Sequence, residues 1–156
     1  MNAAGSESVR RHILVVEADP LISAMICDAL EYAGFETTAV TAAEDALSLA
    51  VMDVPFDLVL ADVDLAGPMS GWELAEAMRE MRGEVPIVYA SACAEAARPE
   101  RRVSNSVHLP KPFTLVALCT AVRDLLAPAR RAPDIAPAPR PVVIDLERHR
   151  ALRAAS

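Results

Sequence analysis

The chain has 156 residues, of which 53% are apolar, enough for one globular domain with a single buried core. Its charge is uneven, because residues 1–127 carry 19 acidic and 9 basic side chains (net −10) whereas residues 128–156 carry 3 acidic and 6 basic ones (net +3). An acidic surface repels phosphate backbones and anionic lipid, so the composition argues against direct binding of DNA or of a membrane surface.

Five short aliphatic runs predict strands, beginning with ILVV near the N-terminus. ILVV, LVL and IVY are continuous rather than alternating, which is typical of strands that helices cover on both faces of a parallel sheet. The five predicted strands are residues 13–16, 35–40, 57–61, 86–90 and 106–109.

The first two segments between these strands carry signals for helix ends. Asp19 precedes Pro20, which places an N-cap residue directly before a proline at the first helical position, and Gly34 supplies a C-terminal stop. Thr41 and Glu44 have the spacing of a capping box, which predicts that a second helix opens there.

Three more helices are expected later in the chain. Ser70 and Glu73 repeat the capping-box spacing and predict a third helix. Residues 91–99 are alanine-rich and predict a short fourth helix, and residues 113–126 carry an apolar face that predicts a fifth. The order is strand–helix repeated five times, which implies an α/β fold with an open, doubly wound, five-stranded parallel sheet.

The sequence divides into three segments. Residues 1–10 are expected to be a flexible N-terminus and residues 11–127 to form the domain. The Pro/Ala/Arg composition of residues 128–156 predicts a disordered tail. Within this tail, residues 142–151 (VVIDLERHRA) are interpreted either as a frayed end or as a docking segment.

Cysteine spacing and hydropathy indicate in which cellular compartment the protein is found. Cys27, Cys93 and Cys119 lie far apart and form no CxxC pair, so we expect reduced thiols rather than a disulfide framework or a zinc site. No stretch approaches the roughly 18 apolar residues of a transmembrane helix. The apolar run near the N-terminus stops at Glu17, too early for a signal peptide. We therefore expect a cytoplasmic protein that does not bind a membrane.

Polar side chains follow four of the predicted strands. In an open α/β sheet, ligands bind beyond the carboxyl ends of the strands, so these residues are candidates for a site. Lys111 is the only lysine of the chain, and a lysine there presents a compact charge to a carboxylate or phosphoryl oxygen. The strand-end residues are Glu17, Ala18 and Asp19 after the first strand, Asp62 and Asp64 after the third, Ser91 after the fourth and Lys111 after the fifth.

The carboxylates at this edge predict a magnesium site. Clustered carboxylates repel one another unless a cation neutralises them, and a hard divalent metal is the natural occupant. Such an ion would screen a phosphoryl group and let Asp62 act as nucleophile in an aspartyl-phosphate reaction. The alternative is that acidic residues at loop starts are only N-caps, a role for which Asp19 is well placed.

Four blocks, ILVVEADP, DLVLADVDLAGPMSGWELA, PIVYASA and HLPKPF, resemble those of the response-regulator receiver family over about residues 11–127. The resemblance implies a flavodoxin-like sheet with strand order 2-1-3-4-5. It implies transfer of a phosphoryl group from a histidine kinase or histidine phosphotransfer protein to Asp62. It also implies that Glu17, Asp62 and the backbone carbonyl of Asp64 hold Mg²⁺.

Three further residues match positions of the family. Ser91 matches the switch residue that turns inward to bond the phosphoryl group, and Lys111 matches the lysine that pairs with it. The family's Lys–Pro peptide bond is typically cis, which here is Lys111–Pro112. His108 stands where the family often has a tyrosine or phenylalanine that moves with the switch residue, and as a lone histidine it is interpreted as structural.

Ala18 departs from the family pattern, because receivers usually carry an acidic residue there as a direct metal ligand. Losing this carboxylate removes one oxygen ligand from magnesium and predicts weakened binding. Asp19 or water is the alternative ligand, although the N-cap role of Asp19 competes for the same side chain. Trp72 is expected to anchor the loop after the third strand by packing.

These observations leave three functions open. The first is a stand-alone response regulator that is phosphorylated on Asp62 and signals to a protein effector through the face of residues 91–99, 106–109 and 113–126. The second is a pseudo-receiver that binds constitutively without phosphorylation, as Ala18 indicates. The third is a phosphate shuttle in a phosphorelay. An enzyme is not expected, because the sequence has neither a glycine-rich phosphate loop nor a serine nucleophile elbow.

Overall fold

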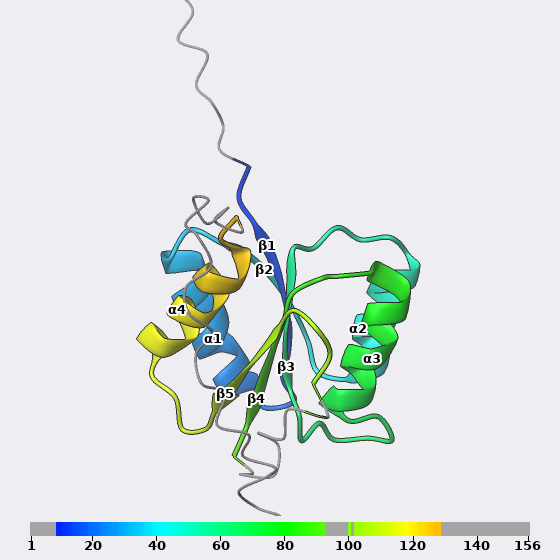
Figure 1. Cartoon of the computed structure of the whole chain (residues 1–156). Helices are drawn as coiled ribbons and strands as arrows, with labels where there is room; N and C mark the ends of the chain where they lie inside the picture. Colours follow the sequence, from blue (N-terminus) through cyan, green and yellow to red (C-terminus); the bar gives the residue numbers. More distant parts are fainter. Residues whose placement is uncertain (1–8, 93–99, 101, 129–156) are drawn as a thin grey trace, which may run out of the picture.

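Five parallel strands form one sheet with helices on both faces (Figure 1). The structure is a computed structural model that describes residues 9–92, 100 and 102–128. The strand order is β2-β1-β3-β4-β5, so the predicted flavodoxin-like fold is confirmed. The strands are His12–Val16 (β1), Glu36–Val40 (β2), Leu58–Asp62 (β3), Ile87–Ser91 (β4) and Ser106–Pro110 (β5), and the helices are Pro20–Tyr32 (α1), Ala43–Val51 (α2), Gly71–Arg82 (α3) and Leu115–Leu126 (α4).

Three of the sequence predictions concern parts of the chain outside the described residues. These are the flexible N-terminus, most of the helix expected over 91–99, and the tail from residue 129 on. Among the residues that are described, no helix is both long and apolar enough to cross a bilayer.

The burial of the strands follows their place in the sheet. The residues of β3 and β4 are all buried, as are four of the five in β1, whereas β2 and β5, the two edge strands, are only partly covered. The continuous aliphatic runs therefore belong to the central strands, which have helices against both faces.

Side chains cap the starts of α1 and α3 as predicted. Asp19 Oδ1 accepts a hydrogen bond from the backbone N–H of Leu21 at 2.8 Å, directly ahead of α1. Ser70 and Glu73 form the reciprocal capping box at the start of α3. Each cap satisfies a backbone donor that has no partner within the helix, and an N-cap of this kind contributes roughly 1 kcal/mol.

The start of α2 differs from the prediction, and the capping box expected between Thr41 and Glu44 is wrong. The N-cap is Ala42, which has no side-chain acceptor. The backbone is still extended there, with φ −128° and ψ 151°, so the Thr41 hydroxyl lies one residue too early to cap the helix. Glu44 and Asp45 instead place negative charge in the first turn, where the helix dipole favours it.

Helix α4 begins at Leu115 rather than at the expected residue 113. Thr114 is the N-cap, and its Oγ1 accepts the backbone N–H of Ala117 at 3.0 Å. Because a capping residue has extended backbone, Phe113 stays outside the helix, and its ring packs against the buried cluster beneath α1 and α4.

Gly34 ends α1 as predicted, through a Schellman motif. Its φ is +98°, in the left-handed region that glycine adopts without a Cβ penalty. The Gly34 N–H donates to the Glu31 carbonyl at 3.0 Å, and the Phe35 N–H donates to the Leu30 carbonyl at 3.0 Å. Phe35 then packs against the buried cluster that contains Leu30.

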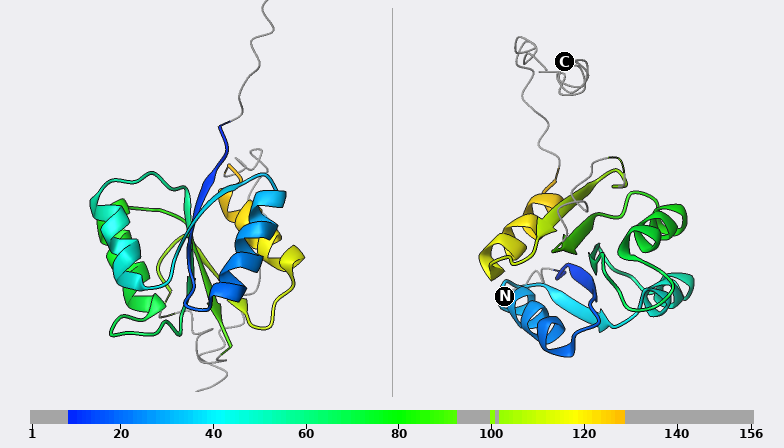
Figure 2. Two further views of the ribbon diagram at one scale, coloured as in Figure 1. Left: turned by 180° about the vertical axis from the view of Figure 1, so that it is seen from behind. Right: turned by 90° about the horizontal axis from the view of Figure 1, so that it is seen from below.

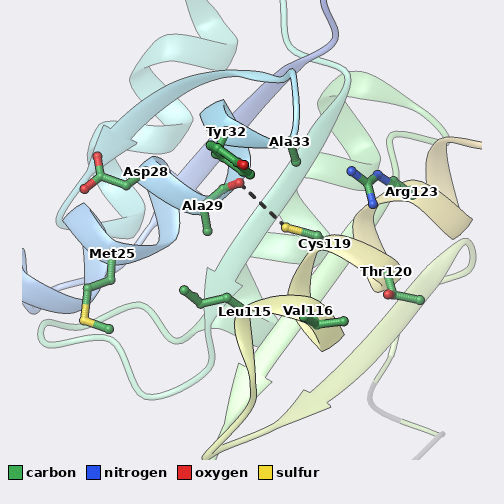
Figure 3. Close-up of a pocket in the computed structure, with 10 residues that line it drawn as sticks. All are labelled: Met25, Asp28, Ala29, Tyr32, Ala33, Leu115, Val116, Cys119, Thr120 and Arg123. Atoms are coloured by element: carbon green, nitrogen blue, oxygen red, sulfur yellow. Dashed lines mark hydrogen bonds between the residues drawn. The ribbon is translucent and has the colours of Figure 1, made fainter.

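Helices α1 and α4 cover one face of the sheet and lie side by side there (Figures 1 and 2). Cys119 Sγ on α4 lies 3.8 Å from the Ala29 carbonyl on α1, to which it donates (Figure 3). The buried residues of this layer are Ile13, Val15, Ile26, Leu30, Leu58, Leu60, Val88, Leu109, Leu118 and Val122.

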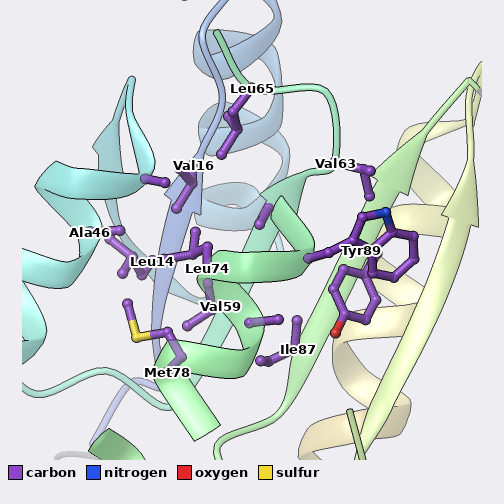
Figure 4. Close-up of a cluster of buried hydrophobic side chains, with 14 of the residues drawn as sticks. Leu14, Val16, Ala46, Val59, Val63, Leu65, Leu74, Met78, Ile87 and Tyr89 are labelled. Atoms are coloured by element: carbon purple, nitrogen blue, oxygen red, sulfur yellow. The ribbon is translucent and has the colours of Figure 1, made fainter. Parts of the chain in front are cut away.

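Helices α2 and α3 cover the opposite face, over a second buried cluster (Figure 4). Trp72 and Tyr89 meet in this cluster with ring centroids 4.4 Å apart, so Trp72, at the end of the loop after β3, is held by packing as predicted. The largest aliphatic contribution from α3 comes from Leu74 and Met78, both fully buried.

Met78 and Met81 allow the packing of α3 to be tested with one side-chain type. Met78 is 0% exposed and Met81 is 42% exposed on the same helix. Met78→Ala should lower the free energy of unfolding by about 2–4 kcal/mol, because it leaves a cavity in the core, whereas Met81→Ala should cost under about 1 kcal/mol. Urea unfolding measures both. Equal losses would contradict the packing described for α3, since Met and Ala differ little in helix propensity.

Candidate functional site

The carboxyl ends of four strands meet at one edge of the sheet, where the predicted site residues lie. Asp62 is the last residue of β3 and Ser91 the last of β4, whereas Glu17 directly follows β1 and Lys111 directly follows β5. All neighbouring strands pair in parallel, so these positions face the same edge. Ligands of open α/β sheets bind at such an edge.

The Lys111 ammonium lies between two buried carboxylates. Lys111 Nζ is 3.0 Å from Asp62 Oδ2 and 3.4 Å from Glu17 Oε2. The Glu17 and Asp62 side chains are 5% and 10% exposed, so solvent screens them little. Two negative groups held this close in a poorly solvated place need a cation, and the ammonium supplies that charge.

A backbone N–H holds the second oxygen of each carboxylate. The Asp64 N–H donates to Asp62 Oδ1 at 2.9 Å. The Asp19 N–H donates to Glu17 Oε1 at 3.1 Å. Each carboxylate is therefore held by the lysine on one oxygen and by its own following loop on the other, which fixes its orientation at the sheet edge.

The same contacts shift two pKa values. Burial raises the pKa of Glu17, Asp62 adds to this by repulsion, and the Asp19 N–H and Lys111 oppose it. Burial by itself lowers the pKa of Lys111, but the hydrogen bond to Asp62 and the charges of Asp62 and Glu17 outweigh it, so that its pKa lies above the usual lysine value. Lys111 is therefore charged at neutral pH.

Ser91, at the end of β4, contacts the loop after β3 and the loop after β5. Its side chain is buried, and its hydroxyl lies 3.4 Å from Asp64 Oδ2. Its backbone carbonyl accepts the N–H of Lys111 at 2.8 Å, which ties the ends of β4 and β5 together. The Lys111–Pro112 peptide bond is cis, as predicted.

Asp19 gives its backbone N–H to the carboxylate–lysine group, whereas its side chain and the His108 ring make other contacts. The Asp19 carboxylate accepts backbone N–H groups of Leu21 and Ile22 and so caps α1. His108 pairs with Tyr89 in the register of β4 and β5, and its Nε2 is buried with no hydrogen-bond partner among the residues that the structure describes. Burial, with the nearby charge of Arg102, lowers its pKa, so the ring is neutral at pH 7.

The oxygen donors at this edge fit a magnesium ion in kind but are few. The carboxylates of Glu17 and Asp62 are hard oxygen ligands of the kind that Mg²⁺ prefers. Across residues 9–92, 100 and 102–128, no three His, Cys, Asp or Glu side chains gather closely enough to hold a metal. Since position 18 is alanine, a bound ion would retain most of its water.

Gly71 is a residue of the site that the sequence reasoning missed. A Cβ at this position would lie 2.3 Å from the Asp62 carbonyl oxygen and 2.8 Å from the Val63 Cα. The Gly71 N–H donates to the Val63 carbonyl at 3.0 Å. The start of α3 therefore presses directly on the backbone that carries Asp62, a tertiary contact that a lone glycine beside a capping box does not reveal.

Comparison with known proteins gives one consistent family. The family model of the response regulator receiver domain matches residues 13–123. The DNA-binding response regulator MtrA of Mycolicibacterium smegmatis is 32% identical over 122 residues, which are 77% of this chain and 52% of that protein. The response regulator SaeR of Staphylococcus epidermidis is 25% identical over 118 residues, 74% of this chain and 50% of that protein. The chain thus spans about half the length of these curated relatives.

Solved structures agree with this result. A response regulator receiver protein from Sinorhizobium medicae has 32% identity and a TM-score of 0.71, with 75% of this chain and 94% of that chain covered. The response regulator TrrA of Thermotoga maritima, solved in complex with Mg²⁺ and BeF, has 26% identity and a TM-score of 0.68, with 74% and 99% covered.

Gly71→Ala should destabilise the protein although alanine is the better helix former. The added Cβ must push α3 away from the backbone of Asp62 and Val63, and overpacking of this kind costs about 1–3 kcal/mol. Urea unfolding measures the loss. An unchanged free energy of unfolding would contradict this prediction, because it would mean that α3 can move away from β3 without loss of stability.

Glu17→Gln should change how stability depends on pH. Because the folded-state pKa of Glu17 is raised above 4.5, its contribution to stability is present when the carboxyl is protonated and is lost as pH rises through the raised pKa. The variant stays neutral, so its stability relative to the parent should increase as the pH rises from 4.5 through the raised pKa of Glu17. Unfolding in metal-free buffer across this range measures the difference. Glu80→Gln, at an exposed position of α3, controls for the change in net charge, and a difference that falls with pH would contradict the burial of Glu17.

Proposed function

The chain belongs to the response regulator receiver family, and we propose that it is a phosphorylation switch that accepts a phosphoryl group on Asp62. Receiver domains are signalling modules of two-component systems rather than enzymes. The proposed domain comprises residues 11–127, and the proposed phosphodonor is a histidine kinase or a histidine phosphotransfer protein.

The arrangement around Asp62 is the observation that supports this proposal. Its carboxylate lies at the end of β3, is mostly buried, and is oriented by the Asp64 N–H at 2.9 Å and the Lys111 ammonium at 3.0 Å. An oriented, poorly solvated carboxylate is a suitable nucleophile for phosphoryl transfer. In the proposed step an Asp62 oxygen bonds to phosphorus while the bond from phosphorus to the donor nitrogen or oxygen breaks.

Lys111 and Ser91 have complementary parts in this proposal. Lys111 Nζ pairs with the carboxylate oxygen and can follow the added negative charge onto a phosphoryl oxygen. The Ser91 hydroxyl, at the end of the adjacent strand, is placed to donate to the same phosphoryl group after it turns from Asp64. Rearrangement of β4 and β5 around these contacts would carry the signal to the surface.

Magnesium is the proposed cofactor, held by Glu17, Asp62 and the Asp64 backbone carbonyl. When bound, the ion screens the negative charge of the phosphoryl group. Ala18 supplies no oxygen ligand, so we propose that magnesium binds more weakly here than in receivers with an acidic residue at this position.

The proposed output is contact with a protein effector through β5, α4 and the segment 91–99. The acidic composition of residues 1–127 supports a protein target rather than DNA, because a net charge of −10 repels the phosphate backbone. MtrA is named as DNA-binding, but this chain covers only 52% of it, so DNA binding is not carried over. The proposed location is the cytoplasm.

A second candidate is a phosphorylation-independent binding module. Two observations favour it: position 18 lacks the acidic residue, and Lys111 already neutralises part of the charge of Glu17 and Asp62. In this case the edge of the sheet would be a permanent structural ion-pair site, and binding to a partner would not respond to Asp62→Asn.

Acetyl phosphate and Mg²⁺ should add one phosphate to the protein, measured by intact mass, and Asp62→Asn should remain unmodified. Ala18→Asp should restore a carboxylate ligand and lower the magnesium concentration needed for half-maximal labelling by about tenfold or more. This variant is the matched test of the proposed effect of Ala18.

Labelling of the Asp62→Asn variant would assign the phosphate to another residue. No adduct on the parent even at high magnesium, with labelling restored by Ala18→Asp, would establish the phosphorylation-independent module. Labelling of the parent at the same magnesium concentration as Ala18→Asp would contradict weakened metal binding.

A further inference from the structure

Large apolar side chains are exposed together in a groove between α1 and α4 (Figure 3). Tyr32 is 98%, Val116 76% and Met25 52% exposed, and all three line a cavity of about 630 Å³. Single exposed apolar residues are common, but a contiguous group of them marks a surface that binds something.

The apolar surface continues toward the carboxylate–lysine site. Met25 and Leu115 also line a second cavity of about 390 Å³, whose wall includes Ile22, Pro112 and Phe113. The two cavities share Met25 and Leu115 and so form one strip along α1 and α4. An occupant of the strip must therefore offer several consecutive apolar side chains.

Among the residues that the structure describes, the groove is lined by one charged residue of each sign, Asp28 and Arg123. Asp28 lines the groove on the last turns of α1, and this helix has no basic residue in its last turn to offset the negative end of its dipole. Arg123 on α4 is the basic residue of the lining and can accept an acidic partner. The complementary segment thus combines an apolar run with arginines and a carboxylate.

The chain itself carries such a segment after α4. Residues 142–151, VVIDLERHRA, have four large aliphatic residues followed by arginines, with acidic residues between them. Residues 128–156 have a net charge of +3 against −10 for residues 1–127, so the two parts attract each other.

The connection is long enough for this segment to return to the groove. Helix α4 ends at Leu126, beside the Arg123 end of the groove. Residues 128–141 are rich in proline and span about 40 Å when extended at about 3.1 Å each. The groove between Arg123 and Leu115 is only about 12 Å long at 1.5 Å per helical residue.

We propose that residues 142–151 dock in the groove between α1 and α4. The aliphatic run Val142–Ile144 and Leu146 cover Tyr32, Val116 and Met25. Arg148 or Arg150 pairs with Asp28, and Asp145 or Glu147 pairs with Arg123. This contact does not depend on phosphorylation of Asp62, and it covers the apolar surface of α1 and α4 that the rest of the domain leaves exposed.

Amide NMR shifts of the full chain test the proposal. A Val143→Ser, Ile144→Ser double variant should shift the amides of Met25, Ala29, Tyr32, Val116 and Thr120, far away in sequence from the change. Ile135→Ser, an aliphatic residue of the connecting segment, is the matched control and should shift only its neighbours.

The reciprocal change is made in the groove. Val116→Asp should increase the rate of trypsin cleavage after Arg148 and Arg150 several-fold, whereas Val51→Asp, at a position of similar exposure (73%) on α2, should not. Shifts of the double variant confined to residues near 143 and 144, or equal cleavage rates in both aspartate variants, would overturn the proposal. Groove shifts that grow with protein concentration would also overturn it, since they would make a second copy the occupant.

Discussion

The ion pair of Lys111 with Glu17 and Asp62 is the constraint on which the functional edge of the sheet depends. Two carboxylates that are at most 10% exposed repel each other unless a cation lies close to both, and Lys111 Nζ lies 3.0 Å from Asp62 Oδ2 and 3.4 Å from Glu17 Oε2. β4 separates the strand that ends in Asp62 from the strand that leads to Lys111. The lysine therefore reaches across β4, and the Ser91 carbonyl holds its backbone in the place from which it can do so.

The fold could be predicted because its signals are local. Continuous aliphatic runs mark the covered strands, and Asp19, Ser70 and Gly34 mark helix ends through hydrogen bonds within a few residues. The two errors at helix starts are also local. Thr41 has the spacing of a capping box, but the N-cap of α2 is the next residue, Ala42. Thr114 is the N-cap of α4, so this helix does not include residue 113. Spacing alone does not say where the backbone turns.

The site could be predicted in its residues but not in its contacts. Strand ends at one edge predicted that Glu17, Asp62, Ser91 and Lys111 come together, and the structure places them there. Neither the use of the Asp64 N–H to orient Asp62 nor the contact of Gly71 with the Asp62 backbone follows from the sequence. The Asp64 contact depends on the turn that the backbone takes after β3, and the Gly71 contact depends on how closely α3 packs against β3 in the layer that contains Trp72.

Ala18 has two opposing consequences for the proposed chemistry. Counted by formal charge, Glu17, Asp62 and Lys111 sum to one negative charge, whereas an acidic residue at position 18 would make it two. The smaller negative charge attracts a divalent cation less strongly. It also repels an incoming phosphoryl group less strongly, since that group is itself an anion. For the proposed chemistry, the loss of one carboxylate would therefore weaken the attraction for the metal and also the repulsion of the phosphoryl group, so that Lys111 would supply a larger share of the neutralising charge.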